Sequence, residues 1–472
     1  MLISVQNILG GQLSAFGGQR LEIELPLSKS ESNRALMILH YAKSQSLRDA
    51  ETQSVMSDSD DTVLLRKHLD TLDKYLQGLL SVDCCPLTLE LDCHNAGTVF
   101  RFLMTAVALA ETQNRRDTKF KVDSQTRHLS TSASQHLSIL LTGSDRMKNR
   151  PIDSLVDALR SLGVVIEYKG REGYPPILVR GGRIEGGRVE VSAEQSSQFA
   201  SSLLLAAPLW KNGLELHLTG NLSSLPYIDM TIDMMRQCGI DVLRNERDIT
   251  VKPGRYNIEN IKVEPDWSAA AFWYEMASFS DNAEILLKNL NINSLQADAA
   301  AIKMFETLGV ETISVEKDNR QQTTDNSNSA VGCQLSVQSS EFSVQRSAFN
   351  FKDCPDLFPA VIAACAGNGV DATFTGLKNL SIKESDRKHA MMNELSKIGI
   401  SFEDVSDDEL KMFCSEKLPY FSENNPIIFN NYDDHRIAMA LSLLSMKIGT
   451  VSMENADVVS KSYPDFFKVI NQ

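Results

Sequence analysis

The sequence has no long run of lysine or arginine, and its 472 residues carry a formal net charge of −14 at pH 7. Its pI is about 5.2. A chain this acidic is repelled by nucleic acid and by anionic membrane surfaces unless its cations are concentrated locally. We therefore expect no nucleic-acid partner and no membrane partner. Basic residues with a functional role must be brought together by folding.

Cysteine motifs and long apolar stretches are missing as well. The eight cysteines include no C-x-x-C pair and no set with histidine at zinc-ligand spacing, which argues against a redox dithiol and a structural zinc. Residues 1–7 lack the basic and apolar parts of a signal peptide, and the most apolar segment, residues 199–210, is too short to cross a bilayer. We expect buried thiols and a cytoplasmic location.

The length of the chain exceeds the size at which one hydrophobic core stops growing, so we expect two domains. One local pattern recurs, in which an amphipathic helical stretch ends at a glycine and a short β-prone run follows. The glycines of this pattern are Gly163, Gly239, Gly309 and Gly399. Each fits a helix C′ position, where the backbone turns left-handed. The recurrence predicts repeated α/β units spread over two domains.

Two small motifs lie where strand-like sequence gives way to helical sequence. Residues 28–34 read Ser-Lys-Ser-Glu-Ser-Asn-Arg, and residues 95–101 read Asn-Ala-Gly-Thr-Val-Phe-Arg. Hydroxyl, ammonium and free helix N–H groups at such a turn can hold an oxyanion. A plain capped helix start explains either motif equally well. Neither is a phosphate-binding P-loop, because G-x-x-x-x-G-K-[ST] is absent.

A third basic motif and two polar motifs follow along the chain. Residues 146–150 place three cations within five residues, which is typical of an anion site or of a solvated loop. Residues 196–199 (Ser-Ser-Gln-Phe) and 224–227 (Ser-Leu-Pro-Tyr) supply uncharged donors that suit hydroxyl groups, or that cap helices. Each motif by itself is weak evidence for a site.

The C-terminal half carries a denser set of charged motifs. They are Pro355-Asp356, residues 383–387 (Lys-Glu-Ser-Asp-Arg), residues 433–436 (Asp-Asp-His-Arg) and residues 461–465 (Lys-Ser-Tyr-Pro-Asp). Asp356 is either the N-cap of the apolar helix that follows or a general base. His435 is expected to be structural rather than a metal ligand, because no second histidine or cysteine lies near it in the sequence.

Taken together, these segments resemble the EPSP synthase (3-phosphoshikimate 1-carboxyvinyltransferase) family of the enolpyruvyl transferase superfamily. The family motif K-S-x-S-N-R matches residues 29–34, N-A-G-T-x-x-R matches residues 95–101, and R-M-x-x-R-P matches residues 146–151. Nine such motifs follow the family order from residue 26 to residue 465. Two positions depart from the family, because Leu27 stands where glycine is usual and Phe102 where proline is usual.

The resemblance implies an α/β (α+β) fold with two domains. Each domain is built from three β/α modules about a pseudo-threefold axis, and the active site lies in the cleft between the domains. The implied domains are residues 21–264, on the shikimate 3-phosphate side, and residues 1–20 with 265–472. Residues 317–329 are polar and almost free of apolar side chains, so we expect an exposed insertion there.

The implied reaction transfers the enolpyruvyl (carboxyvinyl) group of phosphoenolpyruvate (PEP) to the 5-hydroxyl of shikimate 3-phosphate. It gives 5-enolpyruvylshikimate 3-phosphate and phosphate by addition and elimination, as the sixth step of the shikimate pathway to chorismate and aromatic amino acids. Asp356 is expected to accept the hydroxyl proton, and Glu384 to give and retrieve the carbon proton with Lys29 as its partner. We expect no cofactor, no metal and a monomer.

Both substrates carry a carboxylate and a phosphate, so fixed cations are needed, and arginine forks suit both anions. By resemblance, the residues that hold shikimate 3-phosphate are Lys29, Ser30, Arg34, Ser196, Ser197, Gln198, Ser224, Tyr227, Asp356, Asn379 and Lys383. Those that hold PEP are Lys29, Gly97, Arg146, Gln198, Arg387, Arg436 and Lys461.

Two alternative functions are weighed against this hypothesis. UDP-N-acetylglucosamine enolpyruvyl transferase resembles the family in fold and also uses PEP, but it typically has a reactive cysteine in the loop that corresponds to residues 141–151. That loop has no cysteine here. A non-catalytic anion-binding relative would lack proton-handling residues, whereas Asp356, Glu384, Lys29 and Lys461 are all present.

Overall fold

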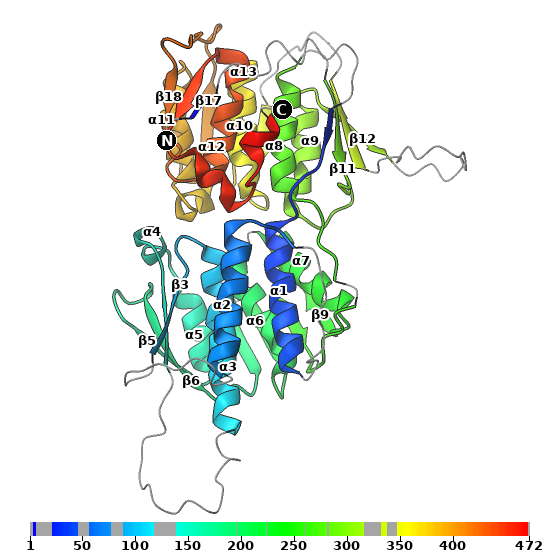
Figure 1. The fold of residues 1–472 in the computed structure, drawn as a ribbon, viewed down its shortest axis with the longest axis vertical. Coiled ribbons are helices and arrows are strands. Elements are labelled where there is room, and N and C mark those ends of the chain that lie inside the picture. The colour runs from blue at the N-terminus through cyan, green and yellow to red at the C-terminus, as the bar shows by residue number, and fades with distance from the viewer. Residues whose placement is uncertain are drawn as a thin grey trace, which may run out of the picture. The chain divides into compact units, whose positions relative to one another are not determined.

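The computed structural model describes residues 3–5, 21–45, 56–76, 88–117, 138–194, 196–222, 224–259, 261–280, 283–315, 332–337 and 347–470. The chain forms two compact units (Figure 1). Unit 1 comprises Met1–Lys29, Met56–Asp60 and Val263–Gln472, and unit 2 comprises Ser30–Val55 and Asp61–Lys262. The insertion expected at residues 317–329 lies outside the described residues.

Unit 2 has two four-stranded sheets of one topology in its described part. The first two strands of each sheet run parallel, and the remaining strands continue antiparallel. The first sheet has the order β3 (Thr88–Asp92), β4 (Ser138–Thr142), β6 (Ile177–Gly182) and β5 (Val164–Tyr168). The second has the order β7 (Gly187–Ser192), β8 (Leu214–Thr219), β10 (Asp248–Val251) and β9 (Val242–Asn245).

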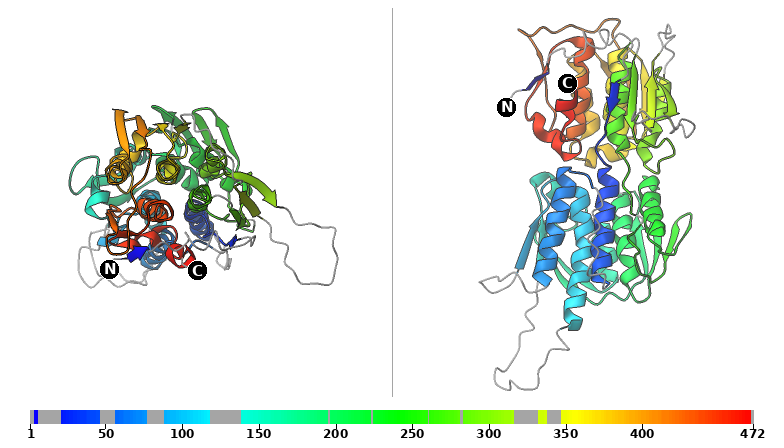
Figure 2. Two further views of the ribbon diagram at one scale, coloured as in Figure 1. Left: turned by 90° about the horizontal axis from the view of Figure 1, so that it is seen from above. Right: turned by 45° about the vertical axis from the view of Figure 1, so that its right-hand side comes forward.

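The helices of unit 2 include α1 and α2, each of which begins where the chain passes from unit 1 to unit 2 (Figures 1 and 2). The longer helices are α1 (Lys29–Ser44), α2 (Asp60–Leu76), α3 (Gly97–Asp117), α6 (Ser197–Ala206) and α7 (Leu225–Gln237). The shorter ones are α4 (Asp145–Lys148), α5 (Asp153–Ser161) and the 3-10 helix η1 (Ala207–Leu209).

Unit 1 repeats the same sheet topology twice in its described part and adds a three-stranded sheet. One sheet has the order β12 (Glu311–Val315), β13 (Gly332–Ser336), β11 (Glu284–Lys288) and β2 (Leu21–Ile23). Another has the order β14 (Ser347–Asn350), β15 (Ala372–Thr375), β17 (Glu409–Phe413) and β16 (Ser401–Ser406). The third is β1 (Ile3–Val5), β19 (Val451–Met453) and β18 (Ile427–Phe429).

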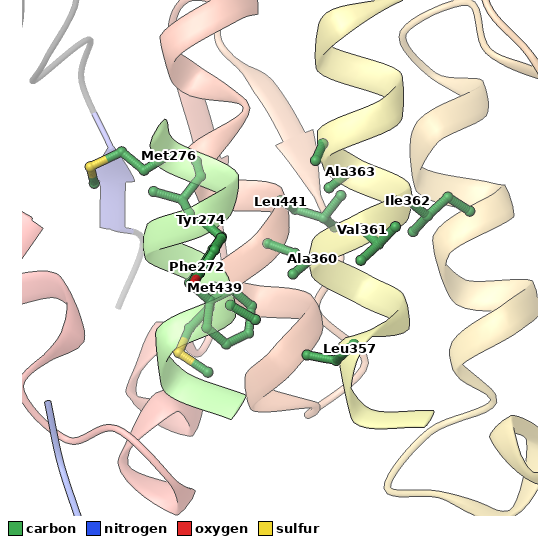
Figure 3. Packing of buried hydrophobic residues seen from close by; sticks show 14 of the residues in the cluster. Phe272, Tyr274, Met276, Leu357, Ala360, Val361, Ile362, Ala363, Met439 and Leu441 are labelled. Atoms are coloured by element: carbon green, nitrogen blue, oxygen red, sulfur yellow. The ribbon is translucent and has the colours of Figure 1, made fainter. Parts of the chain in front are cut away.

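Three apolar helices form the centre of unit 1, and they pack against one another (Figure 3). They are α8 (Trp267–Ser278), α10 (Phe358–Asn368) and α12 (His435–Leu443). Every residue of α8 and of α12 is buried, as expected of helices inside a core. The surrounding helices are α9 (Ala301–Glu306), α11 (Arg387–Ser396), α13 (Ser445–Ile448) and α14 (Phe466–Ile470), with the 3-10 helices η2 (Ala297–Ala300), η3 (Pro355–Leu357), η4 (Lys378–Ile382) and η5 (Ala456–Lys461).

The predicted helix–glycine–strand joints are confirmed. Gly163, Gly239, Gly309 and Gly399 all have φ between +81° and +93°, the left-handed conformation that a side chain disfavours. They follow α5, α7, α9 and α11, and each precedes the outer antiparallel strand of a four-stranded sheet. The four repeats seen in the sequence are therefore the four sheets of common topology.

The boundary between the units differs from the one expected near residue 21. β2 pairs in parallel with β11, and Leu27 forms a bridge with Pro265, so residues 21–29 belong to unit 1. A three-residue strand carries no sequence signal for the sheet that it joins, which explains the difference. Across the described residues, no helix has the length and apolar character needed to span a membrane.

The described cysteines are free thiols, and all but Cys414 are buried. Burial raises the pKa of each of these thiols, as it does for the half-buried Cys414. The prediction of buried thiols is therefore confirmed for the described cysteines other than Cys414. Cys84 and Cys85 lie outside the described residues.

Candidate active site

Nearly all of the predicted site motifs lie at the start of a helix. In unit 2 they occupy the first turns of α1, α3, α6 and α7, and in unit 1 they lie at the starts of α10, α11 and α12. The N-terminus of a helix exposes N–H groups and carries a partial positive charge, which favours anions. The fold thus places anion-binding groups at the N-termini of many helices. A single motif by itself does not indicate this arrangement.

In unit 1, Asp356 lies among three cations. Its Oδ1 accepts a hydrogen bond from Arg387 Nη1 at 2.7 Å, and its Oδ2 accepts one from Arg436 Nη2 at 3.0 Å. The ammonium of Lys383 lies 3.4 Å from Oδ1. Burial by itself raises the pKa of Asp356, but these cations outweigh burial and hold the pKa well below its usual value. Asp356 is therefore ionised, and it is not the helix N-cap that the sequence allowed.

Arg387 is the hub of this cluster. Its side chain is buried, and it donates to Asp434 at 2.8 Å and to Glu384 at 2.9 Å in addition to Asp356. Burial lowers the pKa of Arg387, but the three carboxylates more than compensate and raise the pKa well above its usual value. Most of its N–H groups are engaged by the protein itself, so Arg387 fixes the positions of the carboxylates around it.

Arg436 differs from Arg387 because part of its guanidinium has no partner. Nη2 donates to Asp356, but Nε and Nη1 are buried and have no hydrogen-bond partner among the described residues. A buried donor without a partner costs about 1–3 kcal/mol, so two of them in a charged group call for an explanation. A bound carboxylate or phosphate would satisfy both donors.

Glu384 lies between two cations. Its Oε2 accepts from Arg387, and its Oε1 is 3.5 Å from the ammonium of Lys461. His435 is fully buried beside this cluster, and its ring nitrogens have no hydrogen-bond partner in the described part of the chain. Burial first, and then the charges of Lys29 and Arg436, lower the pKa of His435 well below its usual value, so the ring is neutral.

Two further buried carboxyl groups lie near Asp356 and Arg436 and were not predicted from the sequence. Asp266 caps α8, where its Oδ1 accepts from the N–H of Ser268 at 2.9 Å, and Asp298 accepts a hydrogen bond from the Ser268 hydroxyl. Burial raises the pKa of both, and burial together with the charge of Asp356 raises that of Asp298 to about 7. An aspartate after Pro265 and before an apolar run signals an N-cap, but nothing in the sequence points to Asp298.

In unit 2, three predicted motifs meet around the first turn of α3. Arg101 Nη1 donates to Gln198 Oε1 at 2.6 Å, and Gln198 Nε2 donates to Thr98 Oγ1 at 2.8 Å. A Cβ on Gly97 would lie 2.5 Å from Arg150 Nη1 and 2.6 Å from Arg101 Nη1. Two guanidinium groups therefore converge on Gly97, and two like charges this close favour a bound anion between them.

Arg146 is the residue of the basic motif at 146–150 predicted to hold PEP, whereas Arg101 and Arg150, which reach Gly97, were not among the predicted site residues. Arg146 lies half-buried in α4, whereas Arg150 is buried at Gly97. Both missed residues lie inside motifs that the sequence had singled out. Which cation of a motif points inward depends on the loop conformation, and sequence spacing does not determine that conformation.

The guanidinium of Arg34 makes hydrogen bonds within unit 2. Its Nε donates to Thr231 at 2.7 Å, its Nη1 to the carbonyl of Ser30 at 2.8 Å, and its Nη2 to the carbonyl of Tyr227 at 3.0 Å. The guanidinium lies 5.7 Å from the ring centre of Phe102. Burial lowers the pKa of Arg34 to about 10. Phe102, which replaces the usual proline, is thus a buried support for Arg34.

The remaining predicted residues lie on named elements. Ser196 caps α6, and its Oγ accepts from the N–H of Gln198 at 3.2 Å, so the capping interpretation is correct for this serine. Ser197 begins α6, Ser224 precedes α7 in a left-handed conformation, and Asn379 lies in η4. Within the described ranges, no group of three histidine, cysteine, aspartate or glutamate residues could hold a metal ion.

Repeated α/β units with buried arginines at helix N-termini define an α/β protein whose sites suit anionic small molecules. Residues 17–470 match the family model of EPSP synthase (3-phosphoshikimate 1-carboxyvinyltransferase). The chain is 34% identical over 456 residues to the 3-phosphoshikimate 1-carboxyvinyltransferase of Bacteroides fragilis, covering 96% of this chain and 95% of that protein. The enzyme of the same name from Methanosphaera stadtmanae is 28% identical, covering 95% and 96%.

A solved structure supports the fold. EPSP synthase from Acinetobacter baumannii has a TM-score of 0.65 and 21% sequence identity to this chain, with 96% of each chain covered. The chain therefore belongs to the EPSP synthase family, and its two-domain α/β fold is that of the family. Its reaction is the transfer of the enolpyruvyl group from PEP to shikimate 3-phosphate. The two alternative functions weighed on the sequence are not favoured.

Proposed function

We propose that Asp356, Glu384 and Lys29 carry the proton transfers of this reaction. Asp356 accepts the proton of the 5-hydroxyl while the hydroxyl oxygen bonds to C2 of PEP. Glu384, with Lys29 as its partner, gives a proton to the methylene carbon in the addition and takes one back as phosphate leaves. The observation that supports this most directly is that Asp356 and Glu384 both bind the single buried guanidinium of Arg387.

The cations around Asp356 also link substrate binding to basicity. A carboxylate whose pKa lies well below the usual value is a weak base, so Asp356 is poorly suited to accept a proton in the free enzyme. An anionic substrate on the two Arg436 donors that have no partner among the described residues adds negative charge beside Asp356. This raises the pKa of Asp356 and makes it a better proton acceptor when substrate is present.

The substrate assignments are those predicted from the sequence. For shikimate 3-phosphate they are Lys29, Ser30, Arg34, Ser196, Ser197, Gln198, Ser224, Tyr227, Asp356, Asn379 and Lys383. For PEP they are Lys29, Gly97, Arg146, Gln198, Arg387, Arg436 and Lys461. To the PEP set we add Arg101 and Arg150, because both guanidinium groups reach the space above Gly97. The cytoplasmic location and the monomeric state stay predictions.

The reaction is tested by phosphate release. Purified protein mixed with both shikimate 3-phosphate and PEP is expected to release phosphate in proportion to the enolpyruvyl product, whereas either substrate alone is expected to release none. Replacing shikimate 3-phosphate by UDP-N-acetylglucosamine serves as the acceptor control. An absence of release with both substrates, at high protein concentration, would refute the assignment.

Gly97→Ala is expected to raise the KM for PEP by about tenfold or more, with a smaller change in kcat. The added methyl group displaces the Arg101 and Arg150 guanidinium groups, because it would lie within 2.6 Å of both. Losing one charge-assisted hydrogen bond costs about 1.5–3 kcal/mol, which corresponds to roughly a tenfold to hundredfold change in binding. Steady-state kinetics with varied PEP measures it.

Gly170→Ala is the matched control, since Gly170 is exposed and a Cβ there would make only an ordinary contact, at 3.4 Å from Pro176. Its kinetics should equal those of the unmodified enzyme. Thermal melting of both variants checks that the fold is kept, because the Arg101 guanidinium that the methyl group displaces also binds Gln198. An unchanged KM for PEP would show that these two guanidinium groups do not bind PEP.

A further inference from the structure

The first turn of α8 is held in place by two buried side chains of the segment that follows β11. Gln296 accepts a hydrogen bond from the N–H of Trp267 at 3.0 Å through Oε1, and it donates from Nε2 to the carbonyl of Pro265 at 2.8 Å. Asp298 accepts a hydrogen bond from the Ser268 hydroxyl. Both Gln296 and Asp298 are buried, so these contacts are shielded from water.

The same turn of chain holds the segment that leads to Lys29. The N–H of Asp266 donates to the carbonyl of Pro26 at 2.9 Å, and the N–H of Ser28 donates to the carbonyl of Glu264 at 2.8 Å. Leu27 pairs with Pro265 in an antiparallel bridge. Lys29, two residues after Leu27, is the first residue of α1.

A continuous set of contacts within unit 1 therefore runs from Gln296 and Asp298, through α8, to the backbone before Lys29. Burial is the main influence on the pKa of Asp266, which it raises, and on that of His435, which it lowers. The charge of Lys29 opposes burial at Asp266 and adds to it at His435, so its ammonium lies near the start of α8 and of α12. The buried amide of Gln296 binds the backbone of residues 265–267 through both its oxygen and its nitrogen, so this segment has little conformational freedom.

We propose that Gln296 and Asp298 form a clamp that positions Lys29 for the reaction. They are positioning residues, since they contact the protein and act on the substrate only through Lys29. The proposal rests on the role assigned to Lys29 above. A displacement of about 1 Å at a reacting group can lower activity by about a hundredfold, so a loosened clamp has a measurable effect.

Gln296→Met and Ser268→Ala test the clamp. Gln296→Met keeps the side-chain length and removes both hydrogen bonds, and Ser268→Ala removes the hydroxyl that Asp298 accepts from. We expect kcat/KM for PEP to fall by about 10- to 100-fold in Gln296→Met and by less in Ser268→Ala. Asp298→Asn keeps an oxygen acceptor for Ser268 and is expected to retain activity within about threefold, whereas Asp298→Ala is not.

Glu394→Gln is the control for a purely structural effect. Glu394 is also buried in unit 1, where it binds Tyr432 at 3.0 Å and the N–H of Asn430 at 2.8 Å, and these contacts do not lead to Lys29. Its melting temperature should fall while kcat/KM stays unchanged. If Gln296→Met does not fold, Ser268→Ala and the Asn and Ala variants of Asp298 decide the question.

A double-mutant comparison separates the clamp from the function of Lys29. If the clamp acts through Lys29, adding Gln296→Met or Ser268→Ala to Lys29→Met should cause no further loss of activity. A full additional loss in that background, or wild-type kinetics in the single clamp variants, overturns the proposal. Wild-type activity of Lys29→Met alone would instead overturn the role assigned to Lys29.

Discussion

Asp356→Asn is expected to lower kcat by about 10²- to 10⁴-fold, the range typical of losing one acid–base group. Asparagine keeps the shape of the side chain and one oxygen, but it cannot accept the hydroxyl proton. It also leaves the charges of Arg387 and Arg436 without the carboxylate that both contact. We expect the variant still to bind both substrates, because the surplus positive charge favours anions. Rapid-quench measurement of the chemical step and calorimetric binding would check the two statements separately.

The control for Asp356→Asn is Asp353→Asn, three residues away. Asp353 is exposed, and it takes no part in the contacts that join Asp356 to Arg387, Arg436 and Lys383. The kinetics of Asp353→Asn should therefore be unchanged. A turnover number of Asp356→Asn within a few-fold of wild type would mean that another group accepts the proton. Reduced turnover together with weakened binding would instead indicate that the carboxylate mainly positions Arg436.

Glu275→Met is expected to stabilise unit 1, and to do so increasingly as the pH rises. Glu275 lies in the middle of α8, fully buried, and neither carboxyl oxygen has a hydrogen-bond partner within the described ranges. Burial raises the pKa of Glu275 well above its usual value of 4.5. Removing an unpaired buried polar group contributes about 1–3 kcal/mol to the free energy of unfolding.

The pH dependence follows from the sign of this shift. The folded state holds the Glu275 proton more tightly than the unfolded chain does. The stabilisation of the folded state by this proton is complete below about pH 4.5, and it is lost as the pH rises towards the folded pKa. Glu275→Met has no such proton. Its advantage over wild type should therefore grow by up to about 1.4 kcal/mol per pH unit above about pH 4.5.

Thermal melting of both proteins between about pH 5 and pH 8 measures this difference. Glu306→Met is the control, because Glu306 is exposed on α9 of the same unit and should show no growing advantage with pH. A constant offset between Glu275→Met and wild type across this range would show that Glu275 is ionised, or paired, in the folded state.

The local structure of this protein could be predicted well. The glycines at 163, 239, 309 and 399 were assigned left-handed positions because a helix that ends against a strand needs a residue without a Cβ there, and all of them adopt that conformation. The motifs around Lys29, Gly97 and Asp356 were likewise placed at helix starts, where the structure has them. Both results depend on contacts between near neighbours in the chain.

The features that were not predicted have a different physical origin. The strand at residues 21–23 joins β11, more than 250 residues away, and the approach of the Arg150 guanidinium to Gly97 depends on how the segment after α4 packs. The roles of Gln296 and Asp298 depend on the first turn of α8. None of these pairings leaves a pattern in the amino-acid order, because the partners are remote and the residue types are ordinary.

The sequence by itself determined the family, the repeated α/β units and the set of charged residues, since periodicity, glycine positions and ordered motifs are properties of the chain. Only the tertiary structure decided how those charges are used. In the folded protein Arg387 binds three carboxylates, and Arg34 makes hydrogen bonds to helices of unit 2. Two donors of Arg436 have no partner in the described part of the chain. The physical reason is that a guanidinium group binds whichever oxygens packing brings within reach, and packing is settled by the whole core.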